Sequence, residues 1–143
     1  MDASINYVYA PGSSATLGVV HTRSATDVVQ VNVAGKPTLD SESTAIYGKV
    51  THRILRNLTG SLLAQYQTSE FNGGAYDGDS EDLFLIGVHF DYYFNSHFSA
   101  EFGYNYDMLD SDVKFPLGSG LNSGREARSY ERNRVYIGLT ATY

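Results

Sequence analysis

The stretch that decides the fold is residues 98–108, which run Phe98-Ser99-Ala100-Glu101-Phe102-Gly103-Tyr104-Asn105-Tyr106-Asp107-Met108. Every even-numbered position in this stretch is apolar or aromatic, and every odd-numbered position is polar or glycine. Successive side chains of a β-strand point to opposite sides of the backbone. The period of two therefore predicts a strand with one apolar face and one polar face.

The same alternation recurs along the rest of the chain. It is clearest in residues 84–94 and 135–143 and rougher nearer the N-terminus. No segment of helical length has apolar residues at the i, i+3, i+4, i+7 spacing of an amphipathic helix. The sequence therefore predicts an all-β protein with strands at 2–10, 15–23, 44–54, 58–69, 82–94, 98–108 and 133–143.

The connections between these strands alternate in length. Short connections fall at 11–14, 55–57 and 95–97, and long polar ones at 24–43, 70–82 and 109–132. Short turns at one end, long loops at the other and strands of about ten residues are typical of outer-membrane barrels. We therefore predict an antiparallel up-and-down transmembrane β-barrel, with residues 1–143 in one domain.

Composition narrows the functional classes. The chain of 143 residues has no cysteine, which excludes disulfides and thiolate metal sites, and its net charge of -6 argues against a nucleic-acid partner. Its mean hydropathy of -0.27 would also suit a soluble lipocalin-like barrel with the apolar face inward. Aromatic residues near the strand ends instead favour a girdle at the membrane interface. The expected girdle residues are Tyr9, Tyr92, Phe94, Phe98, Tyr106 and Tyr143.

In the membrane interpretation the polar face lines the lumen. The expected lining residues are Lys49, Arg53, His89, Asp91, Glu101, Asp107 and Arg134. A hairpin centred on Ser96 puts Asp91 opposite Glu101, and two facing carboxylates need a cation. We expect Arg53 and Lys49, two strands away, to supply it. Such a lumen favours a passive conduit that selects solutes by charge, although in a small barrel the same residues would fill the interior.

Two segments resemble a known family. Residues 6–18 (Asn6 to Gly18) and 129–139 (Ser129 to Leu139) are similar to the C-terminal part of bacterial β-barrel porins, some of them linked to surface-polysaccharide systems. The resemblance implies a location in the outer membrane of a Gram-negative-type bacterium and a pore-like body without catalytic residues. It also implies that the closing aromatic Tyr143 is recognised by the barrel-assembly machinery.

The strand number leaves two interpretations open. Single-chain bacterial barrels have even strand numbers, and seven is odd. The residues after Met1 also lack the pattern of a signal peptide. Residues 1–143 are therefore expected to be the last strands of a larger barrel, completed by missing N-terminal strands or by further copies. Alternatively, an eighth strand at 28–34 closes a small barrel.

Other functions have weaker support in the sequence. A closed barrel could instead display its long loops to partners, and Arg125, Arg128 and Arg132 in the last loop suit lipopolysaccharide phosphates in the surrounding membrane. The sequence has neither a G-x-S-x-G nor an H-E-x-x-H motif, so we do not expect an enzyme. No two of the four histidines have the spacing of a ligand pair, so we expect neither a metal nor another cofactor.

Overall fold

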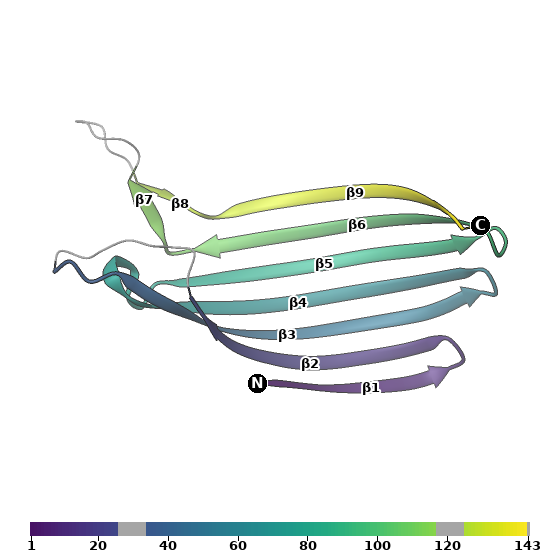
Figure 1. The fold of residues 1–143 in the computed structure, drawn as a ribbon, viewed down its shortest axis with the longest axis horizontal. Helices are drawn as coiled ribbons and strands as arrows, with labels where there is room; N and C mark the ends of the chain where they lie inside the picture. Colours follow the sequence, from purple (N-terminus) through teal and green to yellow (C-terminus); the bar gives the residue numbers. More distant parts are fainter. Residues whose placement is uncertain (26–33, 117–124, 143) are drawn as a thin grey trace.

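The computed structural model describes residues 1–25, 34–116 and 125–142. These residues form an antiparallel sheet of seven strands in the order β1-β2-β3-β4-β5-β6-β9 (Figure 1). Its strands are β1 (Asp2–Ala10), β2 (Ser13–Ser24), β3 (Thr38–Leu55), β4 (Leu58–Gly73), β5 (Ser80–Tyr93), β6 (Phe98–Ser111) and β9 (Tyr130–Ala141). Each strand pairs with its neighbour in the sequence, apart from a two-stranded hairpin of β7 (Lys114–Pro116) and β8 (Arg125–Ala127) between β6 and β9. The predicted antiparallel up-and-down order is confirmed.

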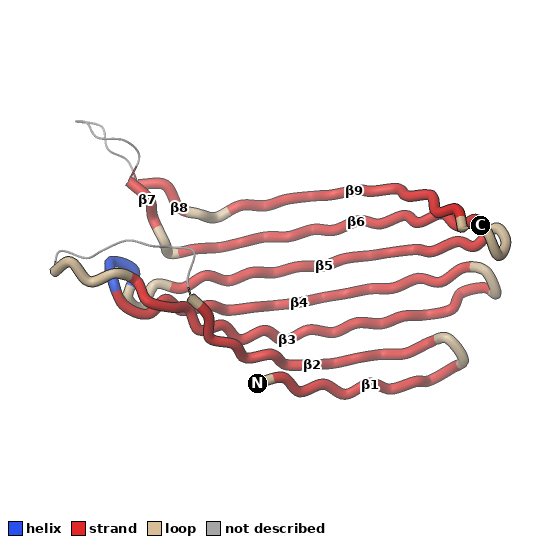
Figure 2. The backbone as a smooth tube through the Cα atoms, in the orientation of Figure 1, coloured by secondary structure: helices blue, strands red, loops and turns tan. Residues whose placement is uncertain are grey.

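The two ends of the sheet differ as predicted. The tight connections β1–β2, β3–β4 and β5–β6 all lie at one end, on the right in Figure 1. Gly12 makes the first of them with a φ of 77°, a conformation that glycine adopts at little cost. The 3₁₀ turn η1 (Gly74–Tyr76), between β4 and β5, and the paired strands β7 and β8 lie at the opposite end (Figure 2). We call these the short-turn end and the long-loop end.

The cross-strand register gathers the apolar residues into a band on one face. One row runs through all seven strands and consists of Tyr7, Ala15, Val50, Leu62, Val88, Tyr104 and Val135. Toward the long-loop end the band stops after the row Val19, Ile46, Tyr66, Phe84 and Met108. The next row on that face is His21, Thr44, Thr68, Asp82 and Asp110. We call the two sides of the sheet the apolar face and the polar face.

No described element covers the apolar face. Ile5 is 77%, Ile137 76% and Leu139 81% exposed, although all three are large hydrophobic residues. In the described part of the chain the buried apolar cluster consists of Phe71, Tyr76 and Val113, at the long-loop end. A soluble barrel would hide such a band inside, because large exposed apolar patches are rare on soluble monomers. The band instead has the alternation and extent of a lipid-facing surface.

Several strands extend further toward the long-loop end than the alternation predicted. β3 begins at Thr38 rather than at residue 44, β4 continues to Gly73, β6 to Ser111, and β9 begins at Tyr130. The predicted long loops were correspondingly too long, and η1, β7 and β8 were not predicted. Beyond the band the apolar residues, such as Leu39, Phe71 and Leu109, are isolated, so no hydrophobic period marks these extensions. Their backbone pairing nevertheless continues.

The band crosses the sheet obliquely. On β3 it reaches Ile46, but on β9 it ends at Val135, whose row meets β3 at Val50. Beyond Val135 the apolar face of β9 carries Asn133 and Glu131. Barrel strands tilt with respect to the barrel axis, so a belt parallel to the membrane cuts across their rows. The oblique band is therefore the pattern that tilted strands produce.

The main sheet has the seven predicted strands, and it is open. Among the described residues, β1 and β9 are its two edges and neither pairs with a further strand. The possible eighth strand at 28–34 lies, except for Ala34, outside the described residues. The described residues also include no helix with the length and hydrophobicity needed to cross a membrane.

Candidate functional site

The seven residues predicted to line a lumen all lie on the polar face. One row contains Arg53, Thr59, Asp91, Glu101 and Gly138, and another contains Lys49, Leu63, Gly87, Asn105 and Arg134. The predicted hairpin register, with Asp91 opposite Glu101 and His89 opposite Gly103, is confirmed. Five of them belong to two clusters at different heights along the strands, whereas Lys49 and Arg53 belong to neither.

The first cluster, which we call the carboxylate–histidine cluster, comprises His89, Asp91 and Glu101. His89 and Asp91 are two residues apart on β5, so they share a face, and Glu101 is the direct partner of Asp91 on β6. The Nε2 atom of His89 lies 2.9 Å from Asp91 Oδ1. The ligand-bearing atoms of all three side chains lie within 4.8 Å of one another.

Tyr136 on β9 holds the His89 ring in place. Its Oη lies 2.9 Å from His89 Nδ1, and the two rings stack with centroids 5.9 Å apart. The side chain reaches β5 by crossing over Gly103 on β6, where a Cβ atom would collide with the Tyr136 ring. Glu101 lies over Gly138 on β9 in the same way. The glycines among the polar positions therefore make room for side chains from the neighbouring strand.

The prediction that Arg53 and Lys49 supply the cation for this cluster is wrong. Arg53 and Asp91 lie in one row on either side of Thr59, about 10 Å apart at ~4.8 Å per strand. The Arg53 guanidinium instead lies toward the β1–β2 turn, where a Cβ on Gly12 would be 2.7 Å from its Nε. Among the described residues no ion pair joins Arg53 or Lys49 to Asp91 or Glu101. Sequence spacing predicted the face and the strand of Arg53 correctly but could not predict the direction of a long side chain.

The second cluster, which we call the arginine–aspartate cluster, surrounds Asp107. The Asp107 side chain is 2% exposed and contacts two arginines of β9. Arg132 donates from Nε to Oδ2 at 2.8 Å, and Arg134 donates from Nη2 to Oδ1 at 3.1 Å. Arg132 was assigned to the last loop because β9 was predicted to begin at 133. Its even number, shared with Arg134 and Tyr136, is the signal that could have placed it on the polar face.

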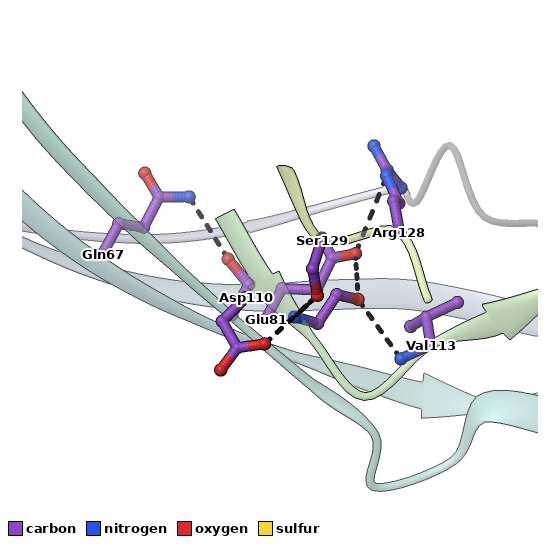
Figure 3. Close-up of polar contacts among 8 residues, drawn as sticks. Gln67, Glu81, Asp110, Val113, Arg128 and Ser129 are labelled. Atoms are coloured by element: carbon purple, nitrogen blue, oxygen red, sulfur yellow. Dashed lines mark hydrogen bonds and ion pairs between the residues drawn. The ribbon is translucent and has the colours of Figure 1, made fainter. Parts of the chain in front are cut away.

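A third polar network lies at the long-loop end (Figure 3). Glu81 on β5 is 9% exposed and accepts a hydrogen bond of 2.7 Å from Ser111 Oγ on β6. The Val113 N–H donates to the same Ser111 oxygen at 3.2 Å, and Arg128 Nε lies 3.7 Å from Glu81 Oε1. Arg128, which was expected to face lipopolysaccharide, thus packs toward the polar face. This network fixes the segments before β7 and after β8 to the end of the sheet.

The expected girdle residues occupy several rows of the band. Tyr9, Tyr92, Phe94 and Phe98 lie at the short-turn end, and Tyr92 and Phe94 pack edge to face with centroids 5.0 Å apart. Tyr106 lies one row inside the opposite border, opposite Ile86. Tyr143 lies outside the described residues.

At the long-loop border of the band, sequence reasoning missed two aromatic residues. Tyr66 and Phe84 are direct partners in the last apolar row. Tyr66 Oη donates a 2.9 Å hydrogen bond to Asp82 Oδ1, in the first polar row beyond the band. A tyrosine with an apolar ring and a hydroxyl directed toward water is typical of a membrane interface.

Together these features define the protein class as an outer-membrane β-barrel. The strands alternate, the connections are short at one end and long at the other, and the uncovered apolar band opposes a charged face. The chain belongs to the family described as "Putative beta-barrel porin 2", which matches residues 2–143. No curated protein and no solved structure matches the chain. The family confirms the predicted resemblance and identifies a porin-like barrel of the bacterial outer membrane.

Proposed function

We propose that the polar face lines a water-filled lumen through which small solutes pass passively, and that fixed charges select among them. One observation carries this proposal: the charged clusters gather on the face opposite the uncovered apolar band. Since lipid contacts the apolar face of a transmembrane barrel, the polar face is the one available to water. We further propose that the membrane is that of a Gram-negative-type bacterium, with lipopolysaccharide around the long-loop end.

The charges are arranged by height along this face. Asp91 and Glu101 lie toward the short-turn end, without a cationic partner among the residues we describe other than His89. Further toward the long-loop end, Arg132 and Arg134 surround the single carboxylate Asp107, which leaves one excess positive charge. Charged side chains that line a pore raise the local concentration of counter-ions. A passing ion would therefore meet an acidic zone and a basic zone in succession.

The test is single-channel recording of the full-length protein in planar bilayers. We expect discrete conductance steps and, across a salt gradient, a reversal potential set by the charged clusters. The double variant Asp91→Asn/Glu101→Gln should shift this potential toward anion selectivity because it removes the acidic zone. Arg134→Gln should shift it in the opposite direction.

The chain offers a matched control on its other face. Asp82 and Asp110 are also direct cross-strand partners, but they lie beyond the band on the apolar face. Asp82→Asn/Asp110→Asn should therefore leave the reversal potential unchanged. An absence of current above that of the bare bilayer would refute the conduit. In that case the alternative of a barrel that displays its loops to partners would become the better hypothesis.

A further inference from the structure

The carboxylate–histidine cluster has a donor set suited to a metal ion. It offers one imidazole nitrogen and two carboxylate oxygens, which all lie within 4.8 Å of one another. Two ligands of a tetrahedral zinc ion, each about 2.0–2.1 Å from the metal, lie about 3.3 Å apart. The separation of 2.9 Å between His89 Nε2 and Asp91 Oδ1 is close to this value. A small side-chain adjustment would thus allow both atoms to bind one ion.

The second nitrogen of His89 already has the partner that a metal-bound histidine needs. Ligand histidines characteristically hydrogen-bond a second residue through the nitrogen that does not bind the metal, which fixes the ring orientation. Here His89 Nδ1 lies 2.9 Å from Tyr136 Oη. With Nδ1–H donating to Tyr136, the lone pair of Nε2 points toward Asp91. A metal ion bound between Nε2 and Oδ1 would displace any proton that Nε2 carries, and that proton would pass to solvent.

Charge also favours a cation at this position. Asp91 and Glu101 are direct cross-strand partners, so their carboxylates repel each other. Arg53, in the same row, lies toward Gly12 instead. His89 alone can offset at most one of the two negative charges. A divalent cation would neutralise both and would satisfy oxygens that are otherwise shared between one imidazole and water.

From these observations we propose that His89, Asp91 and Glu101 bind a divalent transition-metal ion of the Zn²⁺ type on the polar face. The imidazole favours transition metals over Ca²⁺, which prefers six to eight oxygen ligands. The side chains of His89 and Asp91 are 28% and 34% exposed, so an ion in the lumen could reach them. Three protein ligands leave one position of a four-coordinate ion for water or a solute. Tyr136 acts as a positioning residue.

The test measures metal binding directly. The full chain, folded in detergent micelles and freed of metal with a chelator, is titrated with ZnCl₂ in a calorimeter. We expect one ion per chain, and at least tenfold weaker binding in His89→Gln and in Asp91→Asn. His52→Gln is the matched control, because His52 stacks on Tyr9 on the apolar face. This variant should bind Zn²⁺ as the unmodified chain does.

A second measurement tests whether Tyr136 positions His89 for the metal ion or only supports the fold. Co²⁺ added in place of Zn²⁺ should give visible absorption bands that change in Tyr136→Phe, together with roughly 10–100-fold weaker binding. Equal Zn²⁺ affinity in His89→Gln and in the unmodified chain, or no binding at millimolar Zn²⁺, would refute the site. The measurement uses no current, so a barrel that binds Zn²⁺ without conducting would refute only the conduit.

Discussion

At the scale of single residues, neighbours along a strand experience different solvents. Phe102 is 44% exposed on the apolar face, and the adjacent Glu101 belongs to the carboxylate–histidine cluster on the polar face. Phe102 lies in the interior of the band, between Phe90 on β5 and Ile137 on β9. Exposure here therefore means contact with lipid, and the ordinary rule that exposed positions tolerate charge does not apply.

Phe102→Arg should destabilise the folded barrel by about 2–4 kcal/mol, since an arginine near the bilayer midplane carries that cost in a lipid-facing strand. The control is Gln65→Arg on the polar face, between Tyr47 and Leu85, which should cost less than about 1 kcal/mol. Urea-induced unfolding in lipid vesicles measures both values. If Gln65→Arg cost more than Phe102→Arg, the assignment of the two faces would be reversed.

At the scale of strands, the sequence predicts the part of each element that touches lipid. The seven strands, their order and the Asp91–Glu101 register follow from an alternation that lipid and water impose on the two faces. The extension of β3 back to Thr38 could not be predicted, because beyond the band neither face requires apolar residues. The alternation also placed Arg53 on the polar face but could not predict its contact with the β1–β2 turn, because a period of two specifies a face and not a side-chain conformation.

The extension beyond the band has an ionic contact of its own. Arg23 at the end of β2 lies 2.9 Å from Asp40 at the start of β3. The hydrogen bond from Arg23 holds the pKa of the Asp40 carboxyl below its usual value, and a hydrogen bond from Asn72 adds to the effect. Because the folded-state pKa is the lower one, the contact stabilises the strand pair above the unfolded value of about 3.9. That stabilisation is lost as the pH falls through the folded-state pKa.

We therefore expect Arg23→Gln to raise the pKa of Asp40. A pH titration of the carboxyl carbon by NMR, in micelles, gives the midpoint in both proteins. Arg56→Gln, in the tight β3–β4 turn at the other end of the sheet, serves as the control and should leave the midpoint unchanged. An identical Asp40 midpoint in Arg23→Gln and in the unmodified chain would show that the ion pair does not form in solution.

At the scale of the whole molecule, the apolar band sets the thickness of membrane that the sheet fits. On β5 and the turn after it, the band runs from Phe84 to Phe94, ten residue steps. At ~3.3 Å per residue this is about 33 Å along the strand, or about 25 Å along the membrane normal for a strand tilted by ~40°. The bacterial outer membrane is thinner than the average bilayer, which has a hydrocarbon core of about 30 Å.

The full-length protein should consequently fold in higher yield in vesicles of short-chain phosphatidylcholine than in vesicles of long-chain phosphatidylcholine. The physical reason is the cost of mismatch between band and bilayer. The difference in electrophoretic migration between unheated and heated samples gives the folded fraction. Replacement of Thr44 and Thr68, in the first polar row, by leucine should lengthen the band and reduce the difference between the two lipids. A folded fraction independent of chain length would contradict the estimated band height.

The use of alternate positions for the apolar band has a consequence for export. An outer-membrane protein must first pass through the inner membrane, where a run of about 18–20 apolar residues would be retained as a helix. The unfolded chain contains no such run, because polar residues and glycines interrupt every strand; the apolar stretch 83–86, for example, ends at Gly87. The continuous apolar band forms only when the strands pair. The chain can thus travel across the cell envelope as a polar polymer and acquire its affinity for lipid at the destination.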